Sequence, residues 1–170
     1  MNFIIDRPFF LIFFSAFLIL FSLPPFGISI FYWLGLSIFF LSIVSNINFS
    51  KRLIFLFFFI INFISLSWII QSFYSGGFGY LILGIILIFI LSLFISFLNF
   101  SLLVVTHKVF QFSKLKYFLL PLSLSIVDLL KEFLLGGFPW NPSAIIYYKN
   151  IWVLKSLPFL GVYGLGLTIH

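Results

Sequence analysis

The chain has 170 residues, of which 64% are hydrophobic and 7% are charged, and its mean hydropathy is +1.32. A soluble domain of this size could not bury so much apolar surface, so these values exclude a soluble enzyme. They also exclude a disordered chain, because disorder needs low hydrophobicity. The net charge of +6 comes from Lys and Arg residues scattered between long apolar runs, which is typical of membrane topology and not of a nucleic-acid site. We therefore expect an all-α integral membrane protein that does not bind nucleic acid.

Six apolar runs follow one another along the chain, on the scale of the roughly 20 residues that cross a bilayer. The predicted helices are 9–23, 26–44, 53–70, 80–105, 117–135 and 156–170. The first run is short for a span, and the fourth is long enough to require tilt. Residues 1–170 are thus predicted to form one polytopic transmembrane domain, a bundle of about six helices.

Positive charges decide the expected orientation, because short cytoplasmic loops carry more Lys and Arg than outer loops do. The segments on one side contain Arg7, Lys51, Arg52, Lys108, Lys114 and Lys116. The segments on the other side contain only Lys149 and Lys155. We therefore expect a cytoplasmic N-terminus, with residues 136–155 forming a loop at the outer surface.

The sixth run begins at Ser156, and the sequence stops at His170 before this run is long enough to cross a membrane. A natural terminus inside a helix is not expected. The sequence therefore predicts a truncated last helix, in a truncated gene product, a gene fragment or a shortened expression product.

The fifth predicted helix carries the most informative polar residues. Asp128 lies about 10 Å below the outer end of this run, where a charged side chain costs about 2.5–3.5 kcal/mol on insertion scales. Asp128 and Lys131 share a helix face, so an ion pair between them would lower this cost. We interpret the pair as a candidate lipid or substrate site. The alternative is a structural pair that only fixes helix packing, with Lys131 and Glu132 at the headgroups.

Other polar and small residues give weaker signals. Asn62 and Asn99 are expected to bond to a neighbouring helix, as amides in membrane helices usually do. The glycines of the sixth run are interpreted as points of close helix packing, and they are Gly161, Gly164 and Gly166. The chain has no Cys, and its two His residues lie far apart in the predicted topology, so we expect neither a metal site nor a cofactor.

Residues 136–142 read Gly-Gly-Phe-Pro-Trp-Asn-Pro and break the apolar pattern. The glycines permit backbone angles that other residues avoid, and the prolines stiffen the turn. Phe138 and Trp140 suit the headgroup level of a membrane. Up to residue 155, further aromatic and aliphatic residues alternate with Lys and Asn, which predicts a segment lying in the outer interface.

This loop resembles that of the apolipoprotein N-acyltransferases. The resemblance depends on a short motif that follows a helix with one acidic and one basic residue, and the motif is Gly137, Phe138, Pro139 and Trp140. A Tyr, a Leu-Lys pair and a Gly-x-x-Gly helix come after it. Residues 21–27 and Trp68 resemble, more loosely, the first-helix exit and the third helix of that family. The resemblance extends over nearly the whole chain.

The resemblance implies a function in lipoprotein maturation. Members of this family transfer an acyl chain from a phospholipid to the N-terminal diacylglyceryl-cysteine of lipoproteins, through a thioester, at the bacterial inner membrane. A nitrilase-like domain on the outer side carries their Glu–Lys–Cys triad. The implied lipid- or substrate-binding residues here are Asp128, Lys131, Gly137, Phe138, Pro139 and Trp140. The family's Glu-x-x-Arg is Asp128 to Lys131 in this chain, and lysine lacks the planar fork of arginine.

The catalytic triad has no counterpart in these residues. There is no Cys, and the single Glu, Glu132, belongs to a membrane helix, so we expect no catalytic residue here and no activity of the chain alone. Its expected role is to anchor a catalytic domain and to shape a lateral access route for lipid. The implied partners are the bilayer, a phospholipid acyl donor, a diacylglyceryl lipoprotein and a separate nitrilase-like chain. Two alternatives stay open, a small transporter or channel subunit and a non-functional gene remnant.

Overall fold

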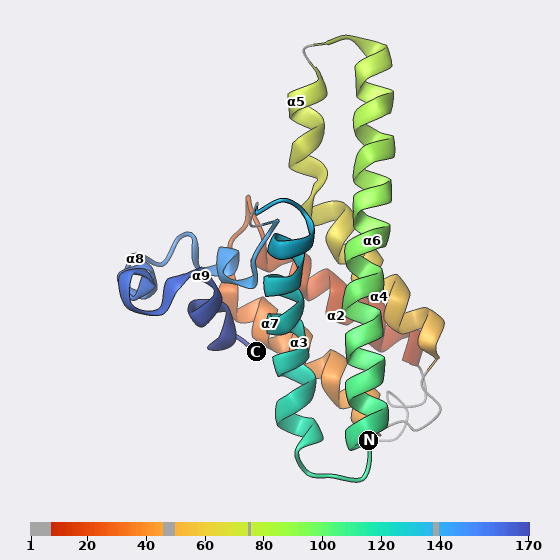
Figure 1. Ribbon diagram of the computed structural model, residues 1–170, viewed down its shortest axis with the longest axis vertical. Helices are drawn as coiled ribbons and strands as arrows, with labels where there is room; N and C mark the ends of the chain where they lie inside the picture. Colours follow the sequence, from red (N-terminus) through yellow and green to blue (C-terminus); the bar gives the residue numbers. More distant parts are fainter. Residues whose placement is uncertain (1–7, 46–49, 75, 138–139) are drawn as a thin grey trace.

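The computed structural model describes residues 8–45, 50–74, 76–137 and 140–170, and within these ranges the regular structure is helical, without β-strands (Figure 1). The α-helices are α2 (Pro8–Ser22), α3 (Ser29–Ser45), α4 (Lys51–Ser65), α5 (Ile70–Tyr74), α6 (Phe78–Phe110), α7 (Lys116–Leu134), α8 (Ile151–Leu154) and α9 (Leu157–Leu167). Two 3₁₀ helices, η1 (Ser67–Ile69) and η2 (Ser143–Tyr147), complete the set. The all-α fold class is confirmed.

Within the described residues, two stretches are long and apolar enough to cross a membrane. They are Lys51–Tyr74 with 24 residues and Phe78–Phe110 with 33 residues. At about 1.5 Å per residue, α6 is roughly 50 Å long and exceeds the roughly 30 Å hydrocarbon core. The other apolar helices are shorter and include Phe9–Ser22, Ser29–Val44 and Leu157–Leu167. The bundle of about six membrane-crossing helices remains a prediction. Two of its helices, among the described residues, have the length that crossing requires.

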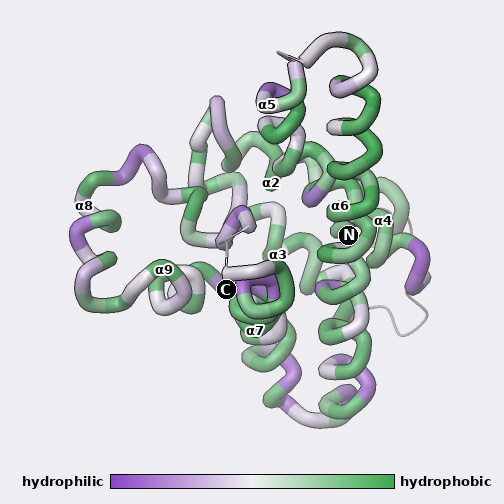
Figure 2. The backbone as a smooth tube through the Cα atoms, turned by 45° about the horizontal axis from the view of Figure 1, so that its top comes forward, coloured by the Kyte–Doolittle hydropathy of each residue, from purple (hydrophilic) through white to green (hydrophobic). Residues whose placement is uncertain are grey.

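The outside of the bundle is apolar. Large hydrophobic side chains point outward from every long helix, as Phe97 and Phe133 do with exposed fractions of 57% and 85%. Hydrophobic residues cover most of the chain trace, and the hydrophilic ones gather in a few turns and in one cluster near the C-terminal end of α7 (Figure 2). Such a surface is stable in lipid and not in water.

The core joins α2, α3, α4 and α7 through interlocked apolar side chains. It includes the stacked pair Phe39 and Phe57, whose ring centroids are 3.8 Å apart and which are both fully buried. The α2–α3 hairpin closes on Gly35, where a Cβ would lie 2.7 Å from Cγ1 of Ile19 and 2.8 Å from the main-chain oxygen of Ser15. The Ser15 hydroxyl donates a 2.6 Å hydrogen bond to the Gly35 oxygen. A missing side chain thus sets the spacing of these helices.

The glycines of α9 differ from their interpretation as packing points. Gly161 has φ 66° and ψ 175°, which breaks the helix inside its range, and nothing lies within 4 Å of a Cβ added there. The nearest atom to a Cβ at Gly164 belongs to Leu160 of the same helix. The close-packing interpretation was therefore wrong for these two glycines, since Gly161 supplies a backbone bend that only glycine adopts readily.

Candidate functional site

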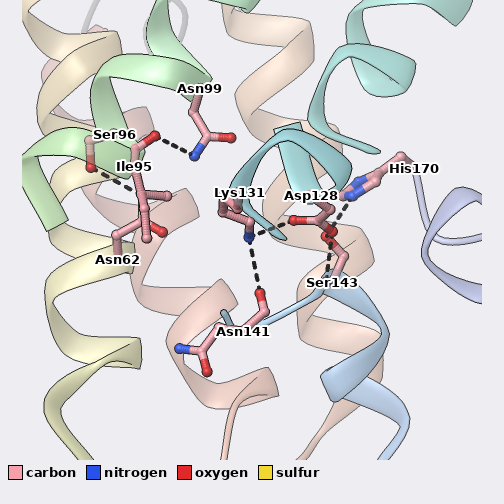
Figure 3. A network of polar contacts seen from close by, with 9 residues as sticks. All are labelled: Asn62, Ile95, Ser96, Asn99, Asp128, Lys131, Asn141, Ser143 and His170. Carbon is pink, nitrogen blue, oxygen red and sulfur yellow. Dashed lines mark hydrogen bonds and ion pairs between the residues drawn. The ribbon is translucent and has the colours of Figure 1, made fainter. Parts of the chain in front are cut away.

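Asp128 and Lys131 form a buried ion pair on α7 (Figure 3). The Nζ of Lys131 lies 2.6 Å from Oδ1 of Asp128, and the two side chains are only 7% and 8% exposed. One helical turn brings the residues onto the same face, as the sequence predicts. A buried pair is stable only when the remaining lone pairs and protons are also satisfied, and here other segments satisfy them.

Ser143 satisfies the second oxygen of Asp128. The main-chain N–H and the hydroxyl of Ser143 both donate to Oδ2, over 2.8 Å and 2.6 Å. Ser143 is the first residue of η2, where a main-chain N–H has no partner inside the helix. The carboxylate of α7 therefore caps η2 from outside, as N-capping side chains do within one segment.

His170 extends the same chain of contacts. Its Nε2 lies 2.8 Å from the hydroxyl oxygen of Ser143. Because that hydroxyl has one proton and donates it to Asp128, Nε2 must donate to Ser143, which places the free lone pair on Nδ1. Nδ1 of His170 is buried without a hydrogen-bond partner among the described residues.

Asn141 links the cluster to α4. Its main-chain oxygen accepts a 3.2 Å hydrogen bond from Nζ of Lys131, and its side-chain amide donates over 2.7 Å to the oxygen of Ser65. Ser65 ends α4, so its carbonyl lacks an intrahelical partner. Asn141 has φ 41°, a left-handed conformation in which Asn is enriched. We call Asp128, Lys131, Asn141, Ser143 and His170 the polar cluster.

Two amides of the membrane helices lie near the polar cluster. Asn62 of α4 donates to the hydroxyl of Ser96 on α6 over 3.1 Å, which confirms the expected bond between helices. Asn99 donates over 3.1 Å to the oxygen of Ile95, one turn earlier in α6. The expectation that Asn99 bonds to another helix was therefore wrong, because its side-chain amide bonds back to a main-chain oxygen of its own helix.

A small cavity whose lining includes a group of polar side chains, here called the polar cavity, and a larger apolar pocket lie next to residues 141 and 140. The cavity has a volume of about 90 Å³, and its polar lining includes Asn62, Asn99, Asp128, Lys131, Asn141, Ser143 and His170. The pocket has a volume of about 490 Å³ and is lined by Ile69, Phe73, Leu87, Ile88, Ile90, Leu91, Phe94, Leu135 and Trp140. The two hollows thus meet at one turn of the chain, where Asn141 lines the first and Trp140 lines the second.

The model for the apolipoprotein N-acyltransferase N-terminal domain matches residues 15–170. This chain belongs to that family. A search of curated proteins and a search of solved structures each found no match. The resemblance predicted from the loop sequence is confirmed, and the matched residues include the whole polar cluster.

The turn after α7 in this N-acyltransferase domain is built on two glycines. Gly136 and Gly137 both have φ 81°, and the N–H of Gly137 donates over 2.8 Å to the oxygen of Glu132. Trp140 donates from its indole to the oxygen of Leu135 over 3.4 Å. The predicted site residues Phe138 and Pro139 lie outside the described residues.

The acyltransferase loop is also attached to the α2–α3 turn. The hydroxyl of Tyr148 donates to the oxygen of Pro25 over 3.0 Å. The ammonium of Lys149 donates to the oxygens of Pro25 and Phe26 over 3.0 Å and 2.6 Å. Gly27, with φ 67°, lets this contact form, because a Cβ there would lie 2.6 Å from the Tyr148 ring.

Sequence reasoning proposed Asp128, Lys131, Gly137 and Trp140 as site residues but missed the residues that join them to the rest of the fold. These are Ser65, Asn141, Ser143 and His170. The only signal for Asn141 was its position directly after the recognised loop motif. Ser143 and His170 have no periodic or spacing signal. Among the described residues, no group of three His, Cys, Asp or Glu residues could hold a metal ion.

Proposed function

We propose that this chain is the membrane domain of an apolipoprotein N-acyltransferase and that it binds the lipid substrates at the turn around residues 140 and 141. The observation that carries this proposal is the meeting of a polar cavity and an apolar pocket at adjacent residues. Asn141 lines the cavity, and Trp140 lines the pocket. A phospholipid or a diacylglyceryl-cysteine has the same two parts, a polar head and apolar chains.

The chemistry of the polar cluster suits binding. Lys131 has three ammonium protons, and its contacts with Asp128 and Asn141 use two of them. The third is free to meet a phosphate or an ester oxygen, as a point charge. Asp128 keeps the ammonium in place and, through Ser143, also fixes the start of η2. The pair thus orients both a ligand and the loop that would hold it.

The acyl-transfer step itself needs another source of nucleophile. A thioester requires an activated thiolate, and the 170 residues contain no Cys. We infer that these residues hold the substrates at the outer side of the bacterial inner membrane and that a nitrilase-like domain, in the same or a separate chain, supplies the Glu–Lys–Cys chemistry. The charge pattern supports this orientation, since loops rich in lysine, such as the one before α7, are typical of the cytoplasmic side.

The test is a competition experiment in membranes. The chain is placed in phosphatidylethanolamine nanodiscs that contain a trace of a photoactivatable phosphatidylethanolamine, and cross-linked peptides are identified by mass spectrometry. We expect an S-diacylglyceryl-cysteine peptide to reduce cross-linking at the peptides containing Leu91 and Trp140. The same peptide without lipid should have no effect. If the lipidated and the unlipidated competitor peptide reduce the cross-linking equally, the proposal is wrong.

A pocket-filling variant makes this test specific. Leu91→Trp adds an indole to the apolar pocket, so the competed cross-link should fall severalfold. Ile82→Trp is the matched control, since Ile82 lies on the same helix, is 44% exposed and does not line the pocket. Equal loss in both variants would contradict binding in this pocket.

A further inference from the structure

The turn between α6 and α7 carries an exposed cluster of lysines. α6 ends at Phe110 and α7 begins at Lys116, with Lys108 in the last turn of α6 and Lys114 in the connection. Lys108 and Lys114 are exposed, and Lys116 is partly exposed. The turn lies at the bottom of Figure 1, far from the polar cluster. We call residues 108–118 the basic tip.

Two further cations lie at the start of α4, which packs against α6. Phe55 of α4 contacts Phe100 of α6, with ring centroids 6.0 Å apart. One turn before Phe55, α4 begins with Lys51 and Arg52, which are both exposed. The acidic residues in the described parts of the chain are Asp128 and Glu132, near the other end of α7. The three lysines of the basic tip therefore have no described carboxylate beside them.

The basic tip is also strongly apolar. Phe112 is 96% exposed and Phe118 is 69% exposed. Lys116 lies along the surface, with Nζ 3.2 Å from the oxygen of Gln111 and 5.4 Å from the ring centroid of Tyr117. Fully exposed aromatic rings between lysines are unfavourable in water and favourable where headgroups meet acyl chains.

We propose that the basic tip is a binding surface for anionic phospholipid, with Phe112 at the boundary between headgroups and acyl chains and the lysines at the lipid phosphates. Charge complementarity selects the partner, because three uncompensated lysines favour headgroups with net negative charge over zwitterionic ones. Phosphatidylglycerol is the simplest lipid of this class. The surface is separate from the turn at residues 140 and 141, so it does not depend on the proposed acyltransferase function.

The first test measures how deep the basic tip lies. Because the chain has no Cys, Gln111→Cys gives a single site for a nitroxide spin label. In phosphatidylglycerol vesicles, the label should be more accessible to oxygen and less accessible to a water-soluble nickel complex than in phosphatidylcholine vesicles. Phe112→Ser in the same background should move the label toward water. Equal accessibility in the two lipids would overturn the proposal.

The second test measures lipid selectivity. Spin-labelled phosphatidylglycerol should associate with the wild-type chain severalfold more strongly than spin-labelled phosphatidylcholine, and high salt should reduce this ratio. The double variant Lys114→Gln with Lys116→Gln should lower this ratio, by at most about fivefold for each lysine removed. Lys149→Gln with Lys155→Gln removes the same charge at the other end and should leave the ratio nearly unchanged. An equal fall in both double variants would show a general charge effect and refute a specific surface.

Discussion

The side-chain amide of Asn141 donates a hydrogen bond to the main-chain oxygen of Ser65 over 2.7 Å, across 76 positions of the sequence. Lys131 binds the main-chain oxygen of the same Asn141. A single loop residue therefore connects the end of α4 to α7. It does so beside the apolar pocket, which η1, α5, α6 and Trp140 enclose.

Asn141→Gly should separate the amide contact from the backbone conformation. Glycine accepts φ 41° and keeps the contact with Lys131, so only the bond to Ser65 is lost. We expect a loss of about 1 kcal/mol in the free energy of unfolding and a wider distance distribution between spin labels at Trp68→Cys and Leu134→Cys. Both positions are exposed. Asn99→Ala, which removes an amide bond within α6, should leave that distribution unchanged, and broadening there too would argue against a specific link.

Asp128→Asn should be strongly destabilising. The variant leaves the buried ammonium of Lys131 without its counter-ion, and breaking a buried pair typically costs about 3–5 kcal/mol. Unfolding in mixed detergent–SDS micelles measures the loss. Replacing both members, as Asp128→Leu with Lys131→Leu, should recover part of it, because no buried charge then remains. A double variant less stable than Asp128→Asn would contradict this account.

Ser143→Ala should weaken the contact between η2 and α7. It removes the hydroxyl bond to Asp128 and the contact with His170, but keeps the main-chain N–H bond to Asp128. A hydrogen bond to a charged group contributes about 1.5–3 kcal/mol, so we expect a loss of that size in the same unfolding assay. Ser123→Ala is the matched control, since this buried serine only bonds to Leu120 of its own helix. Similar losses in both variants would mean that the interhelical contact adds little.

Gly35→Ala should push α2 and α3 apart. The added Cβ would lie 2.7 Å from the Ile19 side chain and 2.8 Å from the main-chain oxygen of Ser15, and overpacking of this kind costs about 1–3 kcal/mol. The hydrogen bond from Ser15 should lengthen as well. Gly79→Ala, at a helical position with open space around it, should instead be neutral or slightly stabilising. Thermal unfolding of both variants checks the contrast.

The local features of the site were predictable because neighbours in the sequence produce them. The Asp128–Lys131 pair follows from helical spacing. The turn after α7 follows from two consecutive glycines. For the amides the sequence predicted only a bond to some other helix, which holds for Asn62 and not for Asn99. By contrast, the bend at Gly161 was interpreted as close packing, since a glycine in an apolar run is compatible with both.

The sequence by itself determined the all-α class of this protein and its family, since apolar runs and a short loop motif are local signals. Only the tertiary structure decided which distant groups complete the buried ion pair. A buried ion pair is stable only when its remaining lone pairs and protons are hydrogen-bonded. The groups that do this, directly or through Asn141, come from the segments that packing brings near, and they are Ser65, Asn141, Ser143 and His170. Hydrogen bonds between such segments leave no period or spacing in the sequence.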